Sequence, residues 1–374
     1  MKLILKAYKI VLKIMTNKTS SKMKKNINKV VIALTLTSLI SLVGCNQNQR
    51  STDEGVKEES KDAPQKIFDK INSTGQITVG FEPDAPPLYF EESGTKKGFD
   101  YDLITYLSKE VFDGVSINTT EDGYDQLPKD LKEGKIDLMA GGRTDEENSD
   151  ELYSDPYLSF GYCLITTTGL AKKYRELSNL NNTKIGVYDD FAAQWVKSKL
   201  PTSNITIIGD REDENTPTSD WMLSLIKGEF DVIIYDYPFA ANEILDYDKK
   251  ITITNNNLNG DELSEYVLVL NKRIDGAAEL MDKINEGIKK FKESSKYSDA
   301  VVQYIPVSNS QASAQFSSAN TYTIKRGETL SIIARDHLGD VFKWKEIYQL
   351  NKNTLASPDI IYPGQNIIKP SGWN

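Results

Sequence analysis

The sequence is poor in the side chains on which most catalytic and metal sites depend. Its 374 residues include one histidine, His337, and two cysteines, Cys45 and Cys163. A Ser-His-Asp triad or a histidine metal site is therefore unsupported, and the chain has no phosphate loop of the Gly-x4-Gly-Lys-Ser/Thr kind. We predict that the protein is not an enzyme and holds no metal and no cofactor. We expect His337 on the solvated face of a helix.

The two cysteines exclude a disulfide framework. Cys45 stands at the end of an export signal, so no pair remains for a bridge within one chain. Cys163 lies in the apolar run Tyr162-Cys163-Leu164-Ile165. Such a run is typical of a buried structural thiol rather than a reactive one.

Positive charge is scarce outside the N-terminal segment. Residues 1–44 hold nine lysines and no acidic side chain, which leaves 36 basic against 54 acidic side chains and a net charge of −18 in the rest of the chain. An exterior this acidic does not suit nucleic acid, which rewards basic patches. It keeps a protein soluble and can favour cationic ligands, although a solvated acidic surface explains the same charge.

The uncharged run near the N-terminus is too short to span a bilayer. Met23-Lys24-Lys25 opens a basic region, and fourteen apolar or small residues follow at 30–43. A membrane helix needs about 20 residues, so this run suits the apolar core of a signal peptide. Residues 1–22 precede this second good start. Either Met23 is the true initiator or the signal has an extended basic region.

The export signal ends in Leu42-Val43-Gly44-Cys45, which resembles the bacterial lipobox. The resemblance implies cleavage before Cys45 and acylation of its thiol, for example with palmitate. Two acyl chains would anchor the protein stably. We expect a signal peptide over 1–44, then the lipidated Cys45 and a polar, disordered tether over 45–65. The protein would lie on the extracytoplasmic face of the cell membrane.

Strand and helix patterns alternate after the tether. Apolar runs predict strands at 76–80, 135–140, 184–187 and 231–235, and amphipathic spacing predicts helices at 102–111 and 277–291. This alternation indicates an α/β fold with largely parallel sheets. Residues 306–321 have the Ser-, Ala-, Asn- and Gln-rich composition of a linker, and a compact segment follows it.

Residues 66–305 carry six motifs that resemble, in order, the bacterial extracellular solute-binding proteins of family 3, the polar-amino-acid class that serves ABC importers. The motifs are residues 75–80, 86–90, 98–103, 131–138, 153–157 and 228–236. The resemblance implies a two-lobed Venus-flytrap periplasmic-binding fold with two hinge crossings that closes around its ligand. Lobe one would comprise 66–157 and 267–305, and lobe two 162–264.

The resemblance also assigns a ligand pocket. Tyr124 matches an aromatic wall, Asp236 matches the carboxylate that binds the ligand's α-ammonium, and Thr144 matches a hydroxyl that helps to hold the ligand's carboxylate. The alternatives, Tyr124 as a core aromatic and Asp236 as a strand-end cap, stay open. The predicted ligand-binding residues are Glu82, Tyr89, Tyr124, Gly142, Arg143, Thr144, Asp190, Tyr235 and Asp236.

The carboxylate-binding half of the pocket departs from the family pattern. Glu147 stands where the family has the arginine that forks onto the ligand's α-carboxylate, and Asp190-Phe191 replaces a Gly-Thr pair that opens a helix toward it. Arg143 would substitute only if its loop turned it inward. The sequence favours a ligand that is cationic or has a blocked carboxylate, such as an amine, a short peptide or a wall fragment. An ordinary amino acid held by Arg143 is the alternative.

Residues 322–370 resemble a LysM domain, with all of that family's elements in order. The resemblance implies a β-α-α-β fold that binds N-acetylglucosamine-containing glycans in a shallow groove. Thr329 would cap the first helix, and we expect Ile332, Ile333, Ile347 and Leu350 in the core, with Trp344 a core residue rather than a sugar platform. The predicted glycan-binding residues are Gly327, Glu328, Thr329, Leu330, Ile360, Ile361, Tyr362 and Pro363. A LysM fold used only for protein contacts is the alternative.

Together these patterns predict a lipid-anchored, cell-wall-associated protein that captures a small amine-bearing solute for an ABC permease and binds peptidoglycan. One alternative is a sensor or scavenger of wall fragments without transport. Another is an accessory to a peptidoglycan-modifying enzyme, since some lytic transglycosylases carry a similar clamshell. The linker at 306–321 has no room for their catalytic domain.

Overall fold

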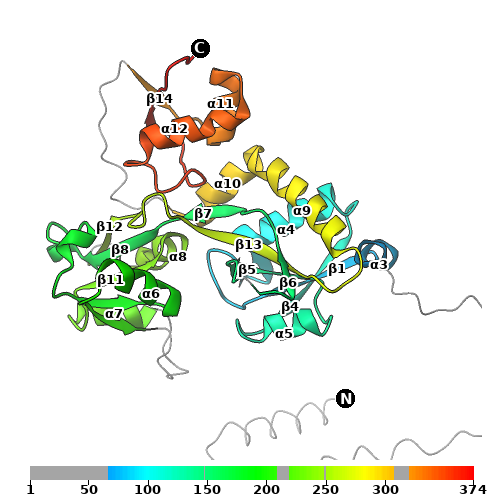
Figure 1. The fold of residues 1–374 in the computed structure, drawn as a ribbon, viewed down its shortest axis with the longest axis horizontal. Helices are drawn as coiled ribbons and strands as arrows, with labels where there is room; N and C mark the ends of the chain where they lie inside the picture. Colours follow the sequence, from blue (N-terminus) through cyan, green and yellow to red (C-terminus); the bar gives the residue numbers. More distant parts are fainter. Residues whose placement is uncertain (1–65, 147, 209–218, 248–249, 307–319) are drawn as a thin grey trace, which may run out of the picture. The chain divides into compact units, whose positions relative to one another are not determined.

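The computed structural model describes residues 66–146, 148–208, 219–247, 250–306 and 320–374. The predicted signal peptide, the lipidation site Cys45, the tether, Glu147 and most of the predicted linker lie outside the described residues. Two α/β lobes and a small C-terminal module follow one another in the chain (Figure 1). Within the described residues, no helix has the length and apolar character needed to cross a membrane.

Lobe one is built on a mixed sheet with the strand order β4-β1-β5-β13-β6. The strands are β1 (Gln76–Phe81), β4 (Ser116–Glu121), β5 (Leu138–Arg143), β6 (Glu151–Tyr153) and β13 (Ser264–Asn271). The hairpin of β2 (Phe90–Glu92) and β3 (Thr95–Lys97) stands apart from this sheet. The helices are α3 (Ile67–Thr74), α4 (Phe99–Glu110), α5 (Leu127–Lys132), α9 (Ala277–Lys292) and α10 (Ser295–Tyr304).

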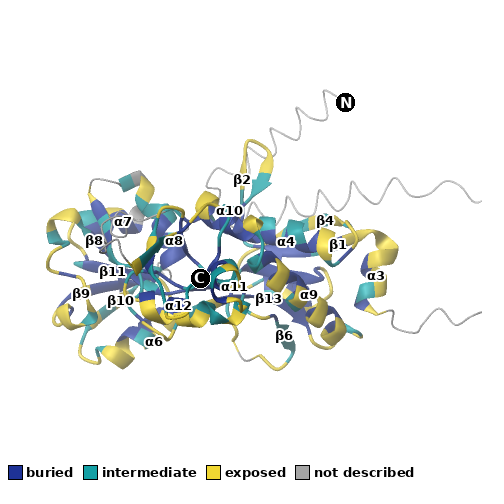
Figure 2. Cartoon of the chain, turned by 90° about the horizontal axis from the view of Figure 1, so that it is seen from above, coloured by how far each residue is buried: buried dark blue, intermediate teal, exposed yellow. Residues whose placement is uncertain are grey.

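The amphipathic helices of lobe one pack as their sequence pattern predicts. Helix α9 buries Leu280, Ile284 and Ile288 at helical spacing. It approaches α4 so closely that a Cβ on Gly287 would lie 2.5 Å from Leu107. In Figure 2 the central strands β1, β5 and β13 and the inner faces of these helices are mostly buried, while the outer faces of the helices are exposed.

Lobe two is a second mixed sheet with the order β10-β9-β11-β8-β12. The strands are β8 (Tyr162–Thr167), β9 (Lys184–Val187), β10 (Asn204–Ile207), β11 (Val232–Asp236) and β12 (Ile251–Asn255). The helices are α6 (Asp190–Lys199), α7 (Ser219–Ile226) and α8 (Tyr237–Glu243), and the short 3-10 turns are Thr168–Leu170, Leu177–Asn179 and Ile244–Tyr247. Cys163 is buried in β8, and burial raises the pKa of its thiol.

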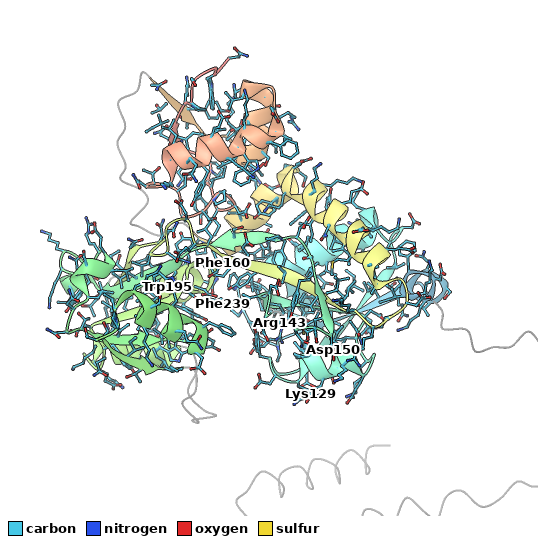
Figure 3. The ribbon with its side chains drawn as sticks, in the orientation of Figure 1. Lys129, Arg143, Asp150, Phe160, Trp195 and Phe239 are labelled. Carbon is cyan, nitrogen blue, oxygen red and sulfur yellow. The ribbon has the colours of Figure 1, made fainter. Side chains whose placement is uncertain are left out.

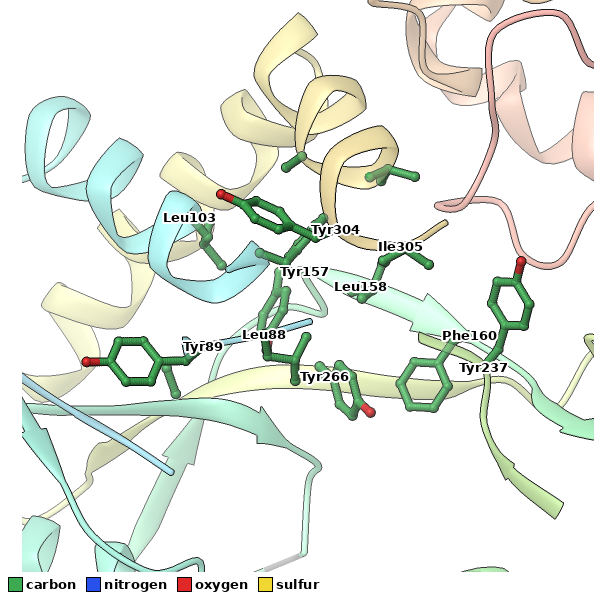
Figure 4. Close-up of a cluster of buried hydrophobic side chains, with 14 of the residues drawn as sticks. Leu88, Tyr89, Leu103, Tyr157, Leu158, Phe160, Tyr237, Tyr266, Tyr304 and Ile305 are labelled. Atoms are coloured by element: carbon green, nitrogen blue, oxygen red, sulfur yellow. The ribbon is translucent and has the colours of Figure 1, made fainter. Parts of the chain in front are cut away.

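The two lobes are joined by two crossing segments. β7 (Leu158–Phe160) leads from lobe one toward β8 and pairs antiparallel with Ser264–Tyr266 at the start of β13, which returns the chain to lobe one. The expectation of largely parallel sheets is therefore only partly correct, because β8 and β13 run antiparallel to their neighbours β11 and β5. The buried residues around this hinge form one continuous cluster with lobe one (Figure 4).

The C-terminal module contains β14 (Thr321–Thr323), α11 (Leu330–Leu338), the 3-10 turn Val341–Lys343, α12 (Trp344–Asn351) and β15 (Asn366–Ile368). The two strands pair antiparallel. Thr329 caps α11 as predicted, since its Oγ1 accepts a hydrogen bond of 3.2 Å from the Ile332 amide. Ile333 and Ile347 are buried as predicted.

Three expectations for this module were wrong or incomplete. Leu350 is 46% exposed rather than in the core, and Ile332 is only half-buried. His337 is half-buried because its ring stacks on Trp373, with centroids 4.7 Å apart. The pairing of the chain's last aromatic with this helix is a tertiary contact that helical spacing does not encode.

Candidate functional site

Charged side chains of both lobes stand at the ends of strands beside the hinge. Arg143 is the last residue of β5 and Asp236 the last residue of β11. Tyr266, on the hinge part of β13, lies between them. Its hydroxyl donates a 2.8 Å hydrogen bond to Asp236 Oδ2, and its ring lies 3.6 Å from where a Cβ on Gly142 would stand. A cation of lobe one and an acid of lobe two therefore flank one tyrosine.

Asp236 is a half-buried carboxyl at the N-terminal end of α8. Burial is the main cause that raises its pKa to about 7, the hydrogen bond from Tyr266 lowers it, and the charge of Asp189 raises it further. Within the described part of the chain, no lysine or arginine offsets this burial. An ammonium group arriving here would supply the missing countercharge in a charge-assisted hydrogen bond.

Arg143 turns inward, which is the condition that the sequence left open. Its side chain is 3% exposed, and its guanidinium carbon lies 3.5 Å from the ring centroid of Tyr124. One Nη2–H donates a 2.5 Å hydrogen bond to the Tyr124 carbonyl, while Nε is buried without a partner among the described residues. The aromatic ring stabilises the cation but does not neutralise it. A buried guanidinium in this state is suited to receive an anion.

Glu82, directly after β1, faces both Arg143 and lobe two. Burial raises the pKa of its half-buried carboxyl, the charge of Arg143 lowers it, and Asp125 raises it. After burial, the charge of Glu82 is also among the causes that raise the pKa of Tyr188 and Tyr235 in lobe two. Glu82 is therefore a second carboxylate of the site, supplied by the opposite lobe from Asp236.

Lobe two contributes an aromatic wall that sequence reasoning found only in part. Tyr188 and Trp221 have ring centroids 4.7 Å apart, Trp221 and Tyr235 5.3 Å apart, and Tyr235 and Phe239 5.7 Å apart. Figure 3 labels Phe239 of this wall together with Arg143 of lobe one. Tyr235 was predicted, whereas Tyr188, Trp221 and Phe239 were not. Position gave a signal for Tyr188, because residues just after a parallel strand commonly bind ligands.

A buried carboxylate shapes the loop that carries Arg143. Asp100 Oδ2 accepts hydrogen bonds from the Gly141 and Gly142 amides, at 2.8 and 3.2 Å, and from the Tyr157 hydroxyl at 2.7 Å. Burial raises the pKa of Asp100 to about 6, against the lowering effect of these hydrogen bonds. Gly142 has φ of +72°, which favours glycine. Asp100 thus holds the turn that aims Arg143 inward, a role that sequence reasoning missed.

The remaining predicted ligand residues divide into three groups. Thr144 is half-buried directly after β5, next to Arg143. Asp190 is exposed in the first turn of α6, where Asp189 accepts a 2.8 Å hydrogen bond from Ala192 as the helix cap. Tyr89 must be corrected to a core residue. It is 1% exposed, its ring stacks on Phe81 with the centroids 4.2 Å apart, and its hydroxyl donates a hydrogen bond to Glu121 within lobe one (Figure 4).

The predicted glycan groove of the C-terminal module is not open along its whole length. Ile360, Ile361 and Tyr362, which were predicted to bind glycan, are each at most 4% exposed. Ile360 and Tyr362 belong to the same buried cluster as the hinge residues. Glu328 is engaged internally, accepting from the Tyr322 hydroxyl and the Lys325 amide. Gly327 and Pro363 remain partly or fully exposed.

Two family models match the chain. Residues 77–307 match the bacterial extracellular solute-binding proteins, family 3, and residues 322–370 match the LysM domain. A probable histidine-binding protein from Campylobacter jejuni is 24% identical over 288 residues, which span 75% of this chain and 99% of that protein. The potassium binding protein Kbp of Escherichia coli is 48% identical over 44 residues, 12% of this chain and 30% of that protein.

A solved structure described as an ancestral cationic amino acid solute binding protein has the same fold. It is 24% identical, has a TM-score of 0.52, and the match covers 64% of this chain and 99% of that one. The two-lobed fold is shared, and the family model spans more than half of the present chain. The chain therefore belongs to the bacterial extracellular solute-binding proteins of family 3, with a LysM domain at residues 322–370.

Proposed function

We propose that this protein captures a cationic amino acid between its two lobes and delivers it to an ABC permease. The observation that carries the proposal is a half-buried carboxyl, Asp236, on lobe two and a buried guanidinium, Arg143, on lobe one, both beside the hinge. Asp236 would take the ligand's α-ammonium and Arg143 its α-carboxylate, each in a charge-assisted hydrogen bond. Because the two groups belong to different lobes, a zwitterion that bridges them favours the closed form.

Arg143 supports one of the two ligand classes that the sequence left open. A ligand with a blocked or missing carboxylate would leave this buried guanidinium with the half-buried Glu82 as its countercharge and Nε without an acceptor, which is costly. A free carboxylate satisfies it. The inward side chain, the cation-π contact with Tyr124 and the unpartnered Nε together favour an ordinary α-carboxylate over an amine or a capped peptide.

The ligand's side chain is proposed to be cationic for a separate reason. With Asp236 assigned to the α-ammonium, Glu82 is left as a second carboxylate beside the site. The wall of Tyr188, Trp221, Tyr235 and Phe239 offers ring faces, which attract guanidinium, imidazolium or ammonium groups. The histidine-binding description of the Campylobacter relative and the cationic-amino-acid description of the ancestral structure agree with this class.

The ligand proposal is tested by isothermal titration of the ligand-free protein with L-arginine, L-histidine, L-glutamine and agmatine. Arginine or histidine should bind most tightly. Agmatine, which has the guanidinium but no carboxylate, should bind at least tenfold more weakly than arginine, since it cannot pair with Arg143. Agmatine binding as tight as arginine would instead support the blocked-carboxylate class. Preference for glutamine would refute the role of Glu82.

Anchoring is the second part of the proposal. The lipobox ending in Cys45 supports attachment to the extracytoplasmic face of the membrane, and the LysM domain supports binding to peptidoglycan. Cell fractionation of a Cys45→Ala variant tests the first, because the variant should leave the membrane fraction. Pull-down with insoluble peptidoglycan tests the second. A chain truncated before residue 322 that sediments as well as the full chain would contradict it.

A further inference from the structure

A cavity of about 210 Å³ separates the LysM domain from helix α9 of the solute-binding domain. The LysM side contributes Thr329, Leu330 and Phe342, and the other side contributes Pro156, Ile288 and Lys289. Thr329 and Leu330 belong to the loop that was predicted to bind glycan. This segment is itself largely buried, with Thr329 8% and Leu330 2% exposed, and its remaining surface faces a second protein wall rather than open solvent.

The two sides of the cavity are held together by a partly buried ion pair. The Asp359 side chain, 10% exposed, lies 2.9 Å from Lys292 Nζ at the end of α9. The same carboxylate accepts a 2.9 Å hydrogen bond from the Ser159 amide in hinge strand β7. Charge-assisted contacts with little exposure to solvent fix an orientation more firmly than surface pairs do. The spacing between the walls is thus set by named contacts.

Docking also removes part of the groove that an isolated LysM domain would present. Ile360 and Tyr362 pack into the buried cluster of the hinge, which includes Tyr237. A ligand of this LysM domain, in this arrangement, meets the Thr329–Leu330 loop and α9, and not the Ile360–Tyr362 segment. Helix α9 of the solute-binding domain takes the place of the Ile360–Tyr362 wall, which that domain covers.

The cavity has the chemistry that an N-acetylated sugar requires. Phe342 is 66% exposed and offers a ring face to the apolar C–H face of a pyranose. Pro156 and Val341, both half-buried, add apolar surface for an acetyl methyl group, while the exposed Lys289 supplies hydrogen-bond donors. A mostly apolar lining with a few polar groups is typical of small-ligand sites.

We infer that the glycan site of this protein is a composite cleft, formed jointly by the LysM loop and by helix α9 of the solute-binding domain, and that it takes N-acetylglucosamine-containing strands. The inference rests on the proposed peptidoglycan binding. It goes beyond it by assigning half of the site to a domain whose family binds small solutes.

The test separates a composite site from a LysM-only site. The chain from residue 45 onward, carrying Cys45→Ser to keep it soluble, is titrated with tetra-N-acetylchitotetraose. Lys292→Met removes the ion pair with Asp359 but leaves every LysM residue intact. It should weaken binding at least tenfold, and Asp359→Asn should do the same from the other side. Lys290→Met, on the same helix but outside the cavity, should leave the affinity unchanged.

The outcomes are distinct. If Lys292→Met binds as well as the parent chain, or more tightly because the Ile360–Tyr362 face is released, the composite cleft is refuted while glycan binding stands. If the parent chain does not bind the oligosaccharide and does not sediment with peptidoglycan, the proposed LysM function itself fails.

Phe342→Ala should abolish binding in the composite cleft, and its thermal midpoint should stay near that of the parent because this ring is largely exposed. Wild-type affinity of Phe342→Ala would place the glycan elsewhere.

Discussion

Ionisation of Asp236 should make the affinity for ligand rise with pH and the stability of the ligand-free protein fall with pH. Only the ionised carboxylate attracts an ammonium group, and the pKa of Asp236 in the ligand-free protein is about 7. At pH 5 roughly 1% of this group is ionised, against about 75% at pH 7.5. The affinity for arginine should therefore rise roughly 50- to 100-fold between these pH values, measured by isothermal titration in buffers of equal ionic strength.

The stability of the ligand-free protein should move the other way. An unfolded aspartate has a pKa of ~3.9, so between about pH 4 and pH 7 the folded state binds more protons than the unfolded state. The free energy of unfolding then falls as pH rises through this window. Asp236→Asn keeps an acceptor for the Tyr266 hydroxyl and removes the titration. It should be more stable than the parent at pH 8 by about 1–4 kcal/mol, and equal to it below pH 4.

Comparison with this variant isolates Asp236 from other titrating groups. Asp100, whose pKa is about 6, and Glu82, whose pKa is also raised by burial, remain in both proteins and cancel in the difference. Urea denaturation at pH 4, 6 and 8 gives the stabilities. Asp282→Asn, on the exposed side of α9, is the control and should change neither quantity. A parent and an Asp236→Asn variant with the same pH profile of affinity would refute the reasoning.

Three further predictions concern the other side of the site. Arg143→Met should weaken arginine binding by about 2–4 kcal/mol, since one partner of a buried charge pair is lost, but should change agmatine binding little; equal losses for both ligands in titrations would contradict a carboxylate role. Glu82→Gln should reduce affinity for arginine about tenfold and spare glutamine, so a uniform loss would mark Glu82 as structural. Gly142→Ala should destabilise the protein by about 2–4 kcal/mol, because its φ is positive and its Cβ would stand 2.7 Å from Leu88. Gly94→Ala, also at positive φ but with no atom within 4 Å, should cost only about 1 kcal/mol in the same urea denaturation. Equal costs would show that packing at Gly142 is unimportant.

Local patterns in the sequence were sufficient for the elements and the family. The runs at 76–80 and 184–187 are β1 and β9, and the amphipathic spacing after residue 277 is α9. Such signals are local, because strand alternation and helical periodicity depend on neighbours within one or two turns of chain. The motifs that resemble family 3 and the LysM domain lie in the segments that the family models match.

The tertiary structure decided how these elements serve a site. The chain's order does not say that Asp100, more than 40 residues before it, holds the turn that points Arg143 inward, or that Tyr266 joins Asp236 to that turn. From its motif, Tyr89 was predicted to line the pocket. In the structure its ring packs against Phe81 in the core of lobe one.

The LysM domain shows the same difference between what local sequence predicts and what tertiary contacts decide. Its sequence by itself determined the two short strands, the capped helix and the glycan-binding resemblance. Only the docked structure decided that Ile360–Tyr362 would be covered and that α9 would form the opposite wall of the cavity. The physical reason is that side-chain direction at a strand end, and access to a groove, depend on contacts between residues far apart in the chain. No periodicity within a segment carries that information.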